Sequence, residues 1–421
     1  MFNKISVVGL GYIGLPTAAM FASHEKAVLG IDVNENAVNT INAGQIHIIE
    51  PDLDIVVRES VEKGFLRASS TPEPADAFLI AVPTPFKADK QPDLSYIEAA
   101  CKAIAPVLEK GNVLVLESTS PVGATKQMAY WIAEMRPDLA LPDSVNSTEH
   151  DIFIAHCPER VLPGHVMREL VENDRVIGGM SRLCAEKARS LYQIFVKGEC
   201  VLTDTDTAEM AKLTENAFRD TNIAFANELS IICDELNIDV WELISIANRH
   251  PRVNILQPGP GVGGHCIAVD PWFIVSKTPE LARLITTARE VNSHKPEWTI
   301  NKIRASLQQK AIDLQVPPNQ VKIAFLGAAF KANIDDLRES PALDIIKAFS
   351  SDLDSVMVVE PNIDSIQGVE KLADTKLVSL EKAIETADIL VLLVEHKEFI
   401  AVPVERLIDK TVLDFKGVWR K

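Results

Sequence analysis

The first 200 residues alternate short apolar runs with longer amphipathic segments. Valine, isoleucine and leucine dominate the short runs, which is typical of buried strands, and the longer segments carry apolar residues at helical spacing. Strands that alternate with helices form parallel sheets covered on both faces, so this part predicts a doubly wound domain. The predicted strands lie at 5–11, 27–33, 77–85, 112–120 and 151–160, and the predicted helices at 15–24, 96–111 and 181–197.

The pattern changes after residue 204. One long helical pattern covers 205–236, a second covers 239–250, and a third runs from about 279 to 309, with a Gly/Pro-rich loop at 257–266 between the last two. This middle part predicts an all-helical segment, and such a segment often carries a dimer interface.

Strand–helix alternation resumes near residue 321 and echoes the first domain. The run at 323–329 repeats the apolar strand and glycine of 5–11, and 358–362 repeats 30–34. The fold class is therefore α/β, with two doubly wound Rossmann-like domains joined by a central helical segment. We predict three domains, at 1–200, 201–310 and 311–421, of which the middle one is a helical linker.

Composition narrows the possible partners. The 421 residues are 47% hydrophobic and 24% charged, which excludes a disordered scaffold, and the formal net charge is −17. This acidic balance disfavours nucleic acid and anionic membranes as partners. The chain shows neither a signal peptide nor an apolar stretch of the ~20 residues that a membrane span needs. Six cysteines without a C-x-x-C pair fit the reducing cytosol, so we expect a cytoplasmic protein without a metal site.

A glycine motif follows the first predicted strand. Gly9, Gly11 and Gly14 form G-x-G-x-x-G, and Asp32 ends the next strand. The glycines allow a tight turn, close approach to a pyrophosphate and close helix–strand packing, while the acid binds ribose hydroxyls and repels a 2′-phosphate. The motif favours NAD over NADP, against the alternative of a purely structural turn.

Three further polar residues follow later strands of the same sheet. These are Thr84, Ser118 and Thr119, and they would open onto the same crevice at the carboxyl edge of the sheet.

Cys266 follows the glycine-dense stretch 259–264. A thiolate attacks an aldehyde readily and leaves readily from a thioester, so we interpret Cys266 as a nucleophile. The alternative is a small buried hydrophobic residue, which we expect of the other five cysteines.

The long central helix carries Lys212, Asn216 and Arg219 on one face. Such a lysine and asparagine could hold a water or an oxyanion, although a solvated polar face has the same spacing. The same ambiguity applies to Glu159, Arg160 and the cluster at 249–252. In the last domain, four basic residues near strand ends would suit a diphosphate, namely Lys331, Arg338, Lys416 and Arg420.

Seven motifs in order resemble the UDP-glucose/GDP-mannose dehydrogenase family over essentially the whole chain. They are GLGYIG, VPTP, ESTSPVG, PER, KLTENAFRD, GGHC-x-x-x-D and FK-x-x-x-DD-x-RESPA. The resemblance implies oxidation of a sugar C6 alcohol to the carboxylate with two NAD in succession. It is strongest to the branch that oxidises acetamido sugars, which implies UDP-N-acetyl-D-mannosamine as substrate and a product for a surface polysaccharide such as enterobacterial common antigen.

The resemblance implies NAD binding by the domain at 1–200, dimerisation by the domain at 201–310 and UDP-sugar binding by the domain at 311–421. It also implies residue roles. Lys212 would act as the base, Cys266 would form the thiohemiacetal and thioester, and Asn216 would stabilise the oxyanion with Lys212. Thr119, Asp270 and Glu159 would orient the hydrolytic water. The residues implied for the cofactor are Gly9, Gly11, Tyr12, Ile13, Gly14, Asp32, Thr84, Ser118, Thr119 and Arg338. Those implied for the substrate are Arg160, Val161, Lys212, Asn216, Arg219, His250, Arg252, Gly263, Phe330, Lys331, Lys416 and Arg420.

The resemblance further implies a homodimer in which His250 and Arg252 reach the substrate of the neighbouring subunit. The chain departs from the UDP-glucose branch at two positions, because Val269 replaces a lysine after the cysteine and Pro163 replaces a glutamate. Two other readings compete with this one. A two-electron hydroxyacid dehydrogenase would have no need of Cys266, and an NAD-binding regulatory protein would form no NADH with any nucleotide sugar.

Overall fold

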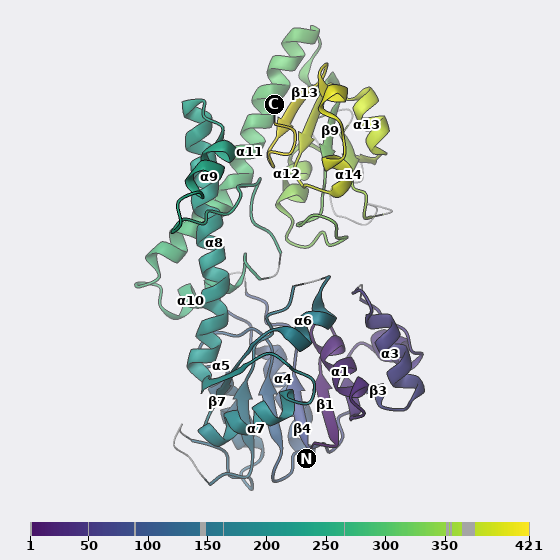
Figure 1. The fold of residues 1–421 in the computed structure, drawn as a ribbon, viewed down its shortest axis with the longest axis vertical. Coiled ribbons are helices and arrows are strands. Elements are labelled where there is room, and N and C mark those ends of the chain that lie inside the picture. Colours follow the sequence, from purple (N-terminus) through teal and green to yellow (C-terminus); the bar gives the residue numbers. More distant parts are fainter. Residues whose placement is uncertain are drawn as a thin grey trace. The chain divides into compact units, whose positions relative to one another are not determined.

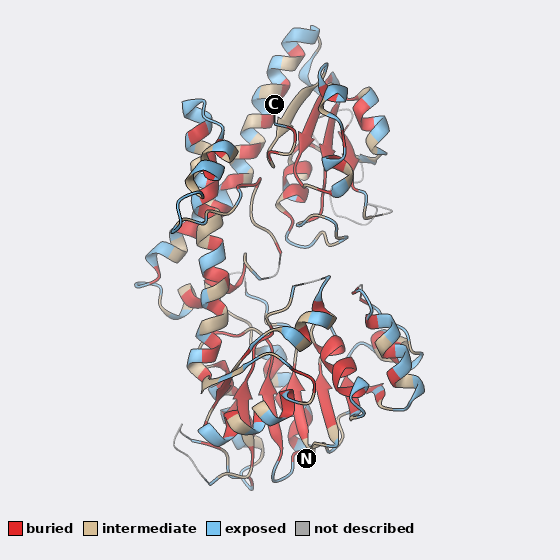
Figure 2. Ribbon diagram, in the orientation of Figure 1, coloured by how far each residue is buried: buried red, intermediate tan, exposed pale blue. Residues whose placement is uncertain are grey.

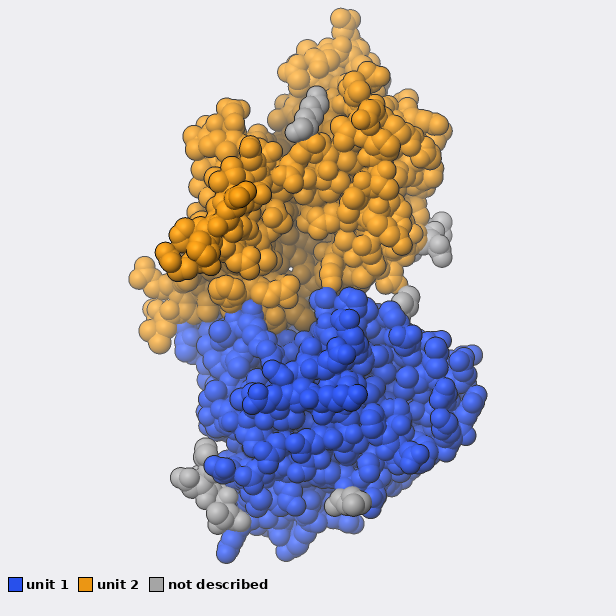
Figure 3. Space-filling view, in the orientation of Figure 1, with its two compact units in different colours: residues 1–215, 272–279 blue, residues 216–271, 280–421 orange. Residues whose placement is uncertain are grey.

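The structure is a computed structural model that describes residues 2–48, 50–87, 90–143, 149–162, 164–264, 266–350, 353, 356–363 and 375–420. The chain divides into two compact units (Figure 3). Unit 1 comprises 1–215 and 272–279, and unit 2 comprises 216–271 and 280–421. The boundary at 215/216 lies within α8 (Thr205–Leu236), that at 271/272 lies within α10 (Asp270–Lys277), and that at 279/280 follows α10. The division at 200 and 310 stays a prediction.

Unit 1 contains one eight-stranded sheet with the order β3-β2-β1-β4-β5-β6-β7-β8 (Figure 1). The first six strands in this order are parallel, and β7 is antiparallel to β6 and parallel to β8. The strands are β1 Lys4–Val8, β2 Ala27–Ile31, β3 Leu66–Ser69, β4 Ala77–Ile80, β5 Val113–Leu116, β6 Phe153–His156, β7 Arg175–Gly179 and β8 Cys200–Asp204.

Both faces of this sheet are buried, as the apolar runs predict. Leu79 packs into the core on the side of α1 and α7, whereas its neighbours Phe78 and Ile80 pack into the core on the side of α4 and α5. This alternation is the two-residue period of a strand. The helices are α1 Gly14–Ser23, α2 Glu35–Asn42, α3 Leu53–Glu62, α4 Ser95–Ile104, α5 Ala124–Met135, α6 Val166–Glu172 and α7 Arg182–Tyr192, with a 3-10 turn at Ala105–Val107.

Unit 2 contains a five-stranded sheet with the order β11-β10-β9-β12-β13, in which all neighbours are parallel. Phe325 packs against α11 and α12 on one face, and Leu326 packs against α13 and α14 on the other. The α/β class with two parallel-sheet domains is therefore confirmed. The strands are β9 Ile323–Leu326, β10 Val356–Val359, β11 Thr375–Leu377, β12 Ile389–Leu392 and β13 Thr411–Asp414.

Unit 2 also contains most of the predicted central helical segment, including the larger part of α8. α8 begins and ends where the pattern predicts, and α11 is continuous through Pro296. Among the described residues, no helix is both long enough and apolar enough to cross a membrane. The remaining helices are α9 Val240–Ala247, α11 Arg283–Leu314, α12 Pro341–Ser350, α13 Leu380–Thr386 and α14 Lys397–Ile400, with 3-10 turns at Pro318–Gln320 and Val404–Leu407.

Candidate active site

The turn between β1 and α1 needs two of its three glycines for packing. Gly9 has a φ of +90°, and a Cβ there would lie 2.7 Å from the Ala81 carbonyl oxygen. A Cβ on Gly14 would lie 1.8 Å from the Gly9 carbonyl oxygen. A Cβ on Gly11 would meet nothing within 4 Å, so this backbone faces open space, as a pyrophosphate site requires.

Asp32 is anchored beside this turn. Its Oδ2 accepts from the Leu10 amide at 2.8 Å, and its Oδ1 accepts from the Asn34 amide at 2.9 Å. The residue is half-buried, and Gly11 and Tyr12 of the glycine turn are exposed. A carboxylate fixed at the carboxyl edge, one strand from the glycine turn, fits the ribose of a dinucleotide.

Thr84 and Ser118 follow β4 and β5, which are parallel neighbours in the same sheet. Ser118 Oγ is held inward, because it donates to the Val82 carbonyl at 2.6 Å. Thr84 Oγ1 is buried and has no hydrogen-bond partner among the described residues. Such an orphaned hydroxyl at the carboxyl edge is a place for a ligand, so the residues fit a bound dinucleotide.

Glu159 is buried, and its two oxygens point to different partners. Oε1 accepts from the backbone amide of Arg160 at 2.7 Å, and Oε2 lies 2.7 Å from Nη1 of the buried Arg175. The Arg160 side chain pairs with Glu215, with an Nη2–Oε1 distance of 2.7 Å. The carboxylate of Glu159 thus anchors the segment that carries Arg160.

The central helix carries the predicted polar set across the boundary of the units. Lys212 is half-buried and belongs to unit 1, whereas the buried Asn216 and the exposed Arg219 belong to unit 2. The helix itself is confirmed, so its 3.6-residue period places the three residues on one face.

Cys266 lies in a turn that leads into α10. Its carbonyl oxygen accepts from the amides of Val269 and Asp270, at 3.1 and 2.9 Å. The residue is exposed, whereas Cys101, Cys157, Cys184 and Cys233 are buried and Cys200 is half-buried. Burial raises the pKa of the Cys101 and Cys157 thiols to about 12. Cys266 therefore differs from the other cysteines as a nucleophile must.

Asp270 joins this turn to α8. Its Oδ2 accepts from Asn216 Nδ2 at 2.6 Å, and both side chains are buried. The structure thus brings Asn216 into contact with Asp270, which lies four residues after Cys266. The resemblance implies a catalytic role for both residues. An amide that donates one hydrogen to a carboxylate still has a second hydrogen to donate.

The backbone before the glycine loop is held by three asparagine side chains. Asn222 and Asn248 each bind the 254–256 segment through both polar atoms of their amides. Asn227 Oδ1 accepts from the Gly259 amide at 2.9 Å. These contacts fix a segment that has no secondary structure of its own.

Asn227 is itself held by a buried network between α8 and α11. Its Nδ2 donates to Asn292 Oδ1 at 2.9 Å, and Asn292 Nδ2 donates to Asp220 Oδ1 at 2.8 Å. Arg289 Nη1 donates to the same Asp220 oxygen at 2.6 Å. All four side chains are buried, so the network is rigid.

The glycine loop packs closely on the segment after β9. A Cβ on Gly263 would lie 2.3 Å from the Glu339 carbonyl oxygen, and one on Gly264, whose φ is +84°, would lie 2.8 Å from the Phe330 ring. The structure therefore brings Gly263 and Phe330 together, as expected of two residues implied for the substrate.

Lys416 and Arg420, the last two of the predicted basic residues, follow the end of β13. Asp414 accepts from the backbone amides of Lys416, Gly417 and Trp419 at 2.7 to 2.9 Å. Lys416 Nζ lies 3.2 Å from a Glu395 oxygen and 3.5 Å from where a Cβ on Gly259 would be. Asp414 thus shapes a turn from which a lysine reaches the glycine loop.

Other predicted residues lie elsewhere in unit 2. Arg338 binds Asp336 through Nε and Nη2, at 2.8 and 2.6 Å. His250 and Arg252 lie on the exposed turn after α9, where the Arg252 amide donates to His250 Nδ1 at 3.3 Å. Among the described residues, no three His, Cys, Asp or Glu side chains are grouped to hold a metal ion.

Known proteins resemble the chain along its whole length. Models of the UDP-glucose/GDP-mannose dehydrogenase family match residues 3–196 (NAD binding domain), 206–294 (central domain) and 324–421 (UDP binding domain). The chain is 59% identical over 421 residues to a UDP-N-acetyl-D-mannosamine dehydrogenase of Escherichia coli, with 100% of each chain covered. It is 60% identical to an NDP-N-acetyl-D-galactosaminuronic acid dehydrogenase of Ralstonia nicotianae, with 99% and 96% covered.

A solved structure agrees with this result. The UDP-D-ManNAc dehydrogenase of Pyrococcus horikoshii matches with a TM-score of 0.87 and 37% identity, covering 99% of this chain and 96% of that chain. The chain belongs to the UDP-glucose/GDP-mannose dehydrogenase family. It is an NAD-dependent oxidoreductase, and the glycine turn, Asp32 and the edge hydroxyls of unit 1 suit the cofactor of this family.

Sequence reasoning missed the residues that support this dehydrogenase site. Arg175, Asn227 and Asp414 each hold a predicted site segment but lie outside the seven motifs, and Glu215 lies inside KLTENAFRD but had no role assigned. Glu209 is a further example, because its buried carboxylate accepts from the amides of Gly123 and Thr125 where α5 begins. The one available signal was the proximity of Glu215 and Asn227 to Lys212 along the same predicted helix.

Proposed function

We propose that this dehydrogenase oxidises the C6 alcohol of UDP-N-acetyl-D-mannosamine to the carboxylate, giving UDP-N-acetyl-D-mannosaminuronate. The observation that carries the proposal is the turn of unit 2, in which an exposed Cys266 is followed after one turn by Asp270 bound to Asn216. The full-length identity of 59% to a UDP-N-acetyl-D-mannosamine dehydrogenase supports the substrate. The alternative of a two-electron hydroxyacid dehydrogenase leaves this arrangement without a use.

The cofactor would be held by the turn of Gly9, Gly11 and Gly14, with Asp32 at the ribose and Thr84 and Ser118 at the edge of the sheet. When bound, NAD supplies the oxidant, since two NAD in succession accept the two hydrides of the four-electron oxidation.

Lys212 takes the proton of the C6 hydroxyl through a water in the first oxidation. The Cys266 thiolate then adds to the aldehyde carbon, and the amide of Asn216 stabilises the resulting alkoxide together with Lys212. Covalent capture retains the aldehyde until the second oxidation, which converts the thiohemiacetal into a thioester.

Hydrolysis releases the product. Water adds to the thioester carbonyl, the C–S bond breaks, and Cys266 leaves as the thiolate. Asp270 and Thr119 orient this water. Glu159 supports the step by fixing Arg160 and Val161, because its oxygens are turned toward the Arg160 amide and Arg175.

The UDP moiety would bind in unit 2, at the loops after the strands of the second sheet. Phe330 and Lys331 follow β9, and Lys416 and Arg420 follow β13. Basic side chains at the carboxyl edge of a parallel sheet suit a diphosphate. Arg219 and Gly263 would line the sugar, and Arg338 would approach the cofactor.

A homodimer would complete the site. Phe218, Phe225 and Ile232 are exposed and recur every seven residues on α8, so they form an apolar stripe along one face of the helix. Figure 2 shows exposed segments, in pale blue, at intervals along this helix. A second copy of this chain covers this stripe in the proposed dimer, and His250 and Arg252 reach the substrate of the partner. The substrate and the cofactor favour a reaction in the cytoplasm.

A second acetamido sugar is a specific alternative. The identity of 60% to an NDP-N-acetyl-D-galactosaminuronic acid dehydrogenase is close to the 59% identity to a UDP-N-acetyl-D-mannosamine dehydrogenase, so the galactosamine configuration is the competing substrate.

The test counts NADH formed per sugar consumed with UDP-N-acetyl-D-mannosamine, UDP-N-acetyl-D-galactosamine and UDP-glucose. We expect two NADH per UDP-N-acetyl-D-mannosamine and little turnover of the others. Cys266→Ser should lower kcat by a factor on the order of 10³ or more, whereas Cys200→Ser, at the half-buried cysteine of β8, should not. One NADH per sugar, or full activity of Cys266→Ser, would exclude the four-electron mechanism.

A further inference from the structure

The second sheet repeats the first at its glycine turn. Gly327 follows β9 with a φ of +94°, as Gly9 follows β1 with a φ of +90°, and Glu360 follows β10 as Asp32 follows β2. Both carboxylates accept from the glycine turn beside them. Asp32 binds one amide of its turn, that of Leu10, whereas Glu360 Oε2 binds two, those of Ala328 and Ala329, at 2.8 and 3.0 Å.

The turn after β9 lacks the features of a dinucleotide site. Ala329 and Ala332 occupy the positions that Gly11 and Gly14 have in the turn after β1, so side chains fill the space that glycine leaves open for a ligand. The two turn amides already bind Glu360, which leaves them no donor for a pyrophosphate. The carboxylate therefore has a different use in this sheet.

His396 is the partner of this carboxylate. Its Nε2 lies 3.0 Å from Glu360 Oε2, and both side chains are completely buried. Its Nδ1 accepts from the Asn333 backbone amide at 2.9 Å, so in a neutral ring the proton is on Nε2 and is donated to Glu360. Although burial alone would raise it, the pKa of Glu360 is lowered by the hydrogen bonds from His396 and from the amides of Ala328 and Ala329.

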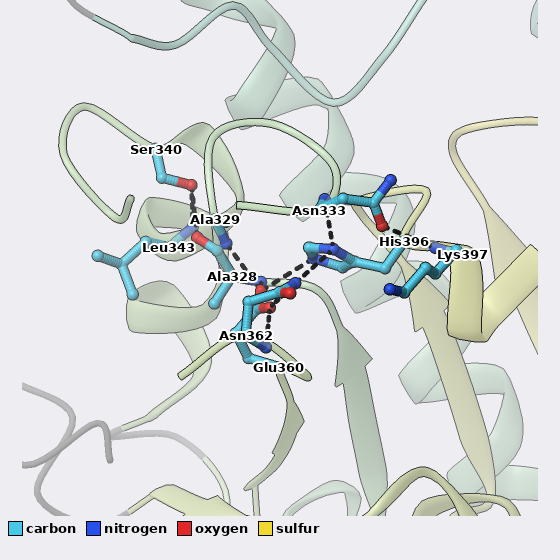
Figure 4. Close-up of polar contacts among 9 residues, drawn as sticks. All are labelled: Ala328, Ala329, Asn333, Ser340, Leu343, Glu360, Asn362, His396 and Lys397. Atoms are coloured by element: carbon cyan, nitrogen blue, oxygen red, sulfur yellow. Dashed lines mark hydrogen bonds and ion pairs between the residues drawn. The ribbon is translucent and has the colours of Figure 1, made fainter. Parts of the chain in front are cut away.

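The pair binds both ends of one loop (Figure 4). Glu360 holds the start of the 328–333 loop through two amides, and His396 holds its end through the amide of Asn333, whose φ is +61°. Two further contacts close the arrangement, because Ser340 Oγ donates to the Ala328 carbonyl and the Lys397 amide donates to Asn333 Oδ1.

Phe330 and Lys331 lie between these two ends. We propose that Glu360 and His396 are a positioning pair, which holds the 328–333 loop so that it can bind the UDP of the substrate. Neither residue needs to touch the ligand. The proposal rests on the proposed function, since it assigns the UDP to this loop.

The first test is Glu360→Gln, which keeps the size of the side chain and removes its charge. We expect the dissociation constant for UDP, measured by calorimetry on the full chain, to rise at least about tenfold while that for NAD changes less than twofold. The KM for the nucleotide sugar should rise by a similar factor and that for NAD should not. An unchanged UDP dissociation constant would overturn the proposal, as would an equal loss of both ligands.

A matched control lies at the amino ends of the strands of the same sheet, opposite the carboxyl ends where the loop lies. Asp388 Oδ2 accepts from the Lys322 amide at 2.9 Å, so Asp388→Asn alters a carboxylate–amide contact far along the strand from the loop. This variant should bind UDP like the parent chain.

A second variant separates the two ends of the loop. His396→Gln keeps a donor for Glu360 at the position of Nε2 and leaves no acceptor for the Asn333 amide at the position of Nδ1. Without any ligand, hydrogen exchange should become faster at residue 333 and stay slow at 328 and 329, and UDP binding should again weaken. Equal exchange at both ends would overturn the proposal. If the parent chain binds no UDP, the proposed function fails. The exchange measurement needs no ligand, so it still tests whether the positioning pair holds the 328–333 loop.

Discussion

Asn216 donates from Nδ2 to Asp270 Oδ2 at 2.6 Å, and both side chains are buried. This contact ties the central helix to the turn that follows Cys266, over a separation of 54 residues. It orients the amide that is proposed to stabilise the alkoxide and the carboxylate that is proposed to orient the hydrolytic water. In the proposed mechanism, one hydrogen bond thus serves both the oxidation and the hydrolysis.

Asp270→Asn should therefore slow hydrolysis more than oxidation. The oxygen of the new amide is a weaker acceptor for the hydrogen of Asn216 than a carboxylate, and the amide orients water poorly, so we expect kcat to fall roughly 10²-fold. Mass spectrometry of the quenched enzyme should show an acyl group on Cys266. The exposed Asp313→Asn on α11 is the control and should behave as the parent. Normal turnover by Asp270→Asn would contradict the assigned role.

Asn227→Ala should loosen the backbone that leads to the glycine loop. The change removes the acceptor for the Gly259 amide and the donor to the Asn292 side-chain oxygen. We therefore expect a loss of about 1–3 kcal/mol in the free energy of unfolding. Hydrogen exchange at Gly259 should accelerate, and kcat should fall. The exposed Asn301→Ala on α11 should change none of these. Slow exchange at Gly259 in Asn227→Ala would show that the loop is held by other contacts.

Glu117→Gln should change how stability depends on pH. Burial raises the pKa of Glu117 to about 7, although the nearby Arg175 and the Tyr192 hydroxyl, which donates to Oε1 at 2.6 Å, favour its ionised form. An acid whose pKa is higher in the folded state contributes stability below its unfolded value, near 4.5, and this contribution is lost as the pH rises through 7.

The variant should therefore gain stability relative to the parent between pH 5 and pH 8, by up to about 3 kcal/mol. Chemical denaturation at a series of pH values measures this gain, with the exposed Glu62→Gln on α3 as the control. A constant difference between variant and parent over this range would mean that Glu117 does not bind a proton on folding.

Phe225→Glu should separate the proposed dimer. The residue lies in the middle of the exposed apolar stripe of α8, and a carboxylate there would be desolvated against a second copy. Sedimentation should show the mass of one chain, 46.2 kDa, and activity should fall with the loss of the shared site. A charge at the exposed Ile312 of α11 should leave the mass unchanged. A parent chain that is already monomeric would exclude the dimer.

The sequence alone determined the parts of this protein that depend on local spacing. The two-residue and 3.6-residue periods predicted both sheets and the long central helix, because burial of apolar side chains follows these periods directly. The glycine turn, Asp32 and the distinction of Cys266 from the buried cysteines were predictable for the same reason. Each depends on neighbours within about 20 residues.

The tertiary structure alone decided the partners of the polar side chains. A carboxylate such as Glu159, Glu360 or Asp414 has the same sequence signature whether it faces solvent or a backbone amide. The Glu360–His396 contact joins residues 36 apart, and that of Asn227 with Asn292 joins residues 65 apart. Such pairs form only after the sheets and helices have packed. Since a buried polar group must then find whichever donor or acceptor lies beside it, packing rather than local pattern decides which residues hold the site in place.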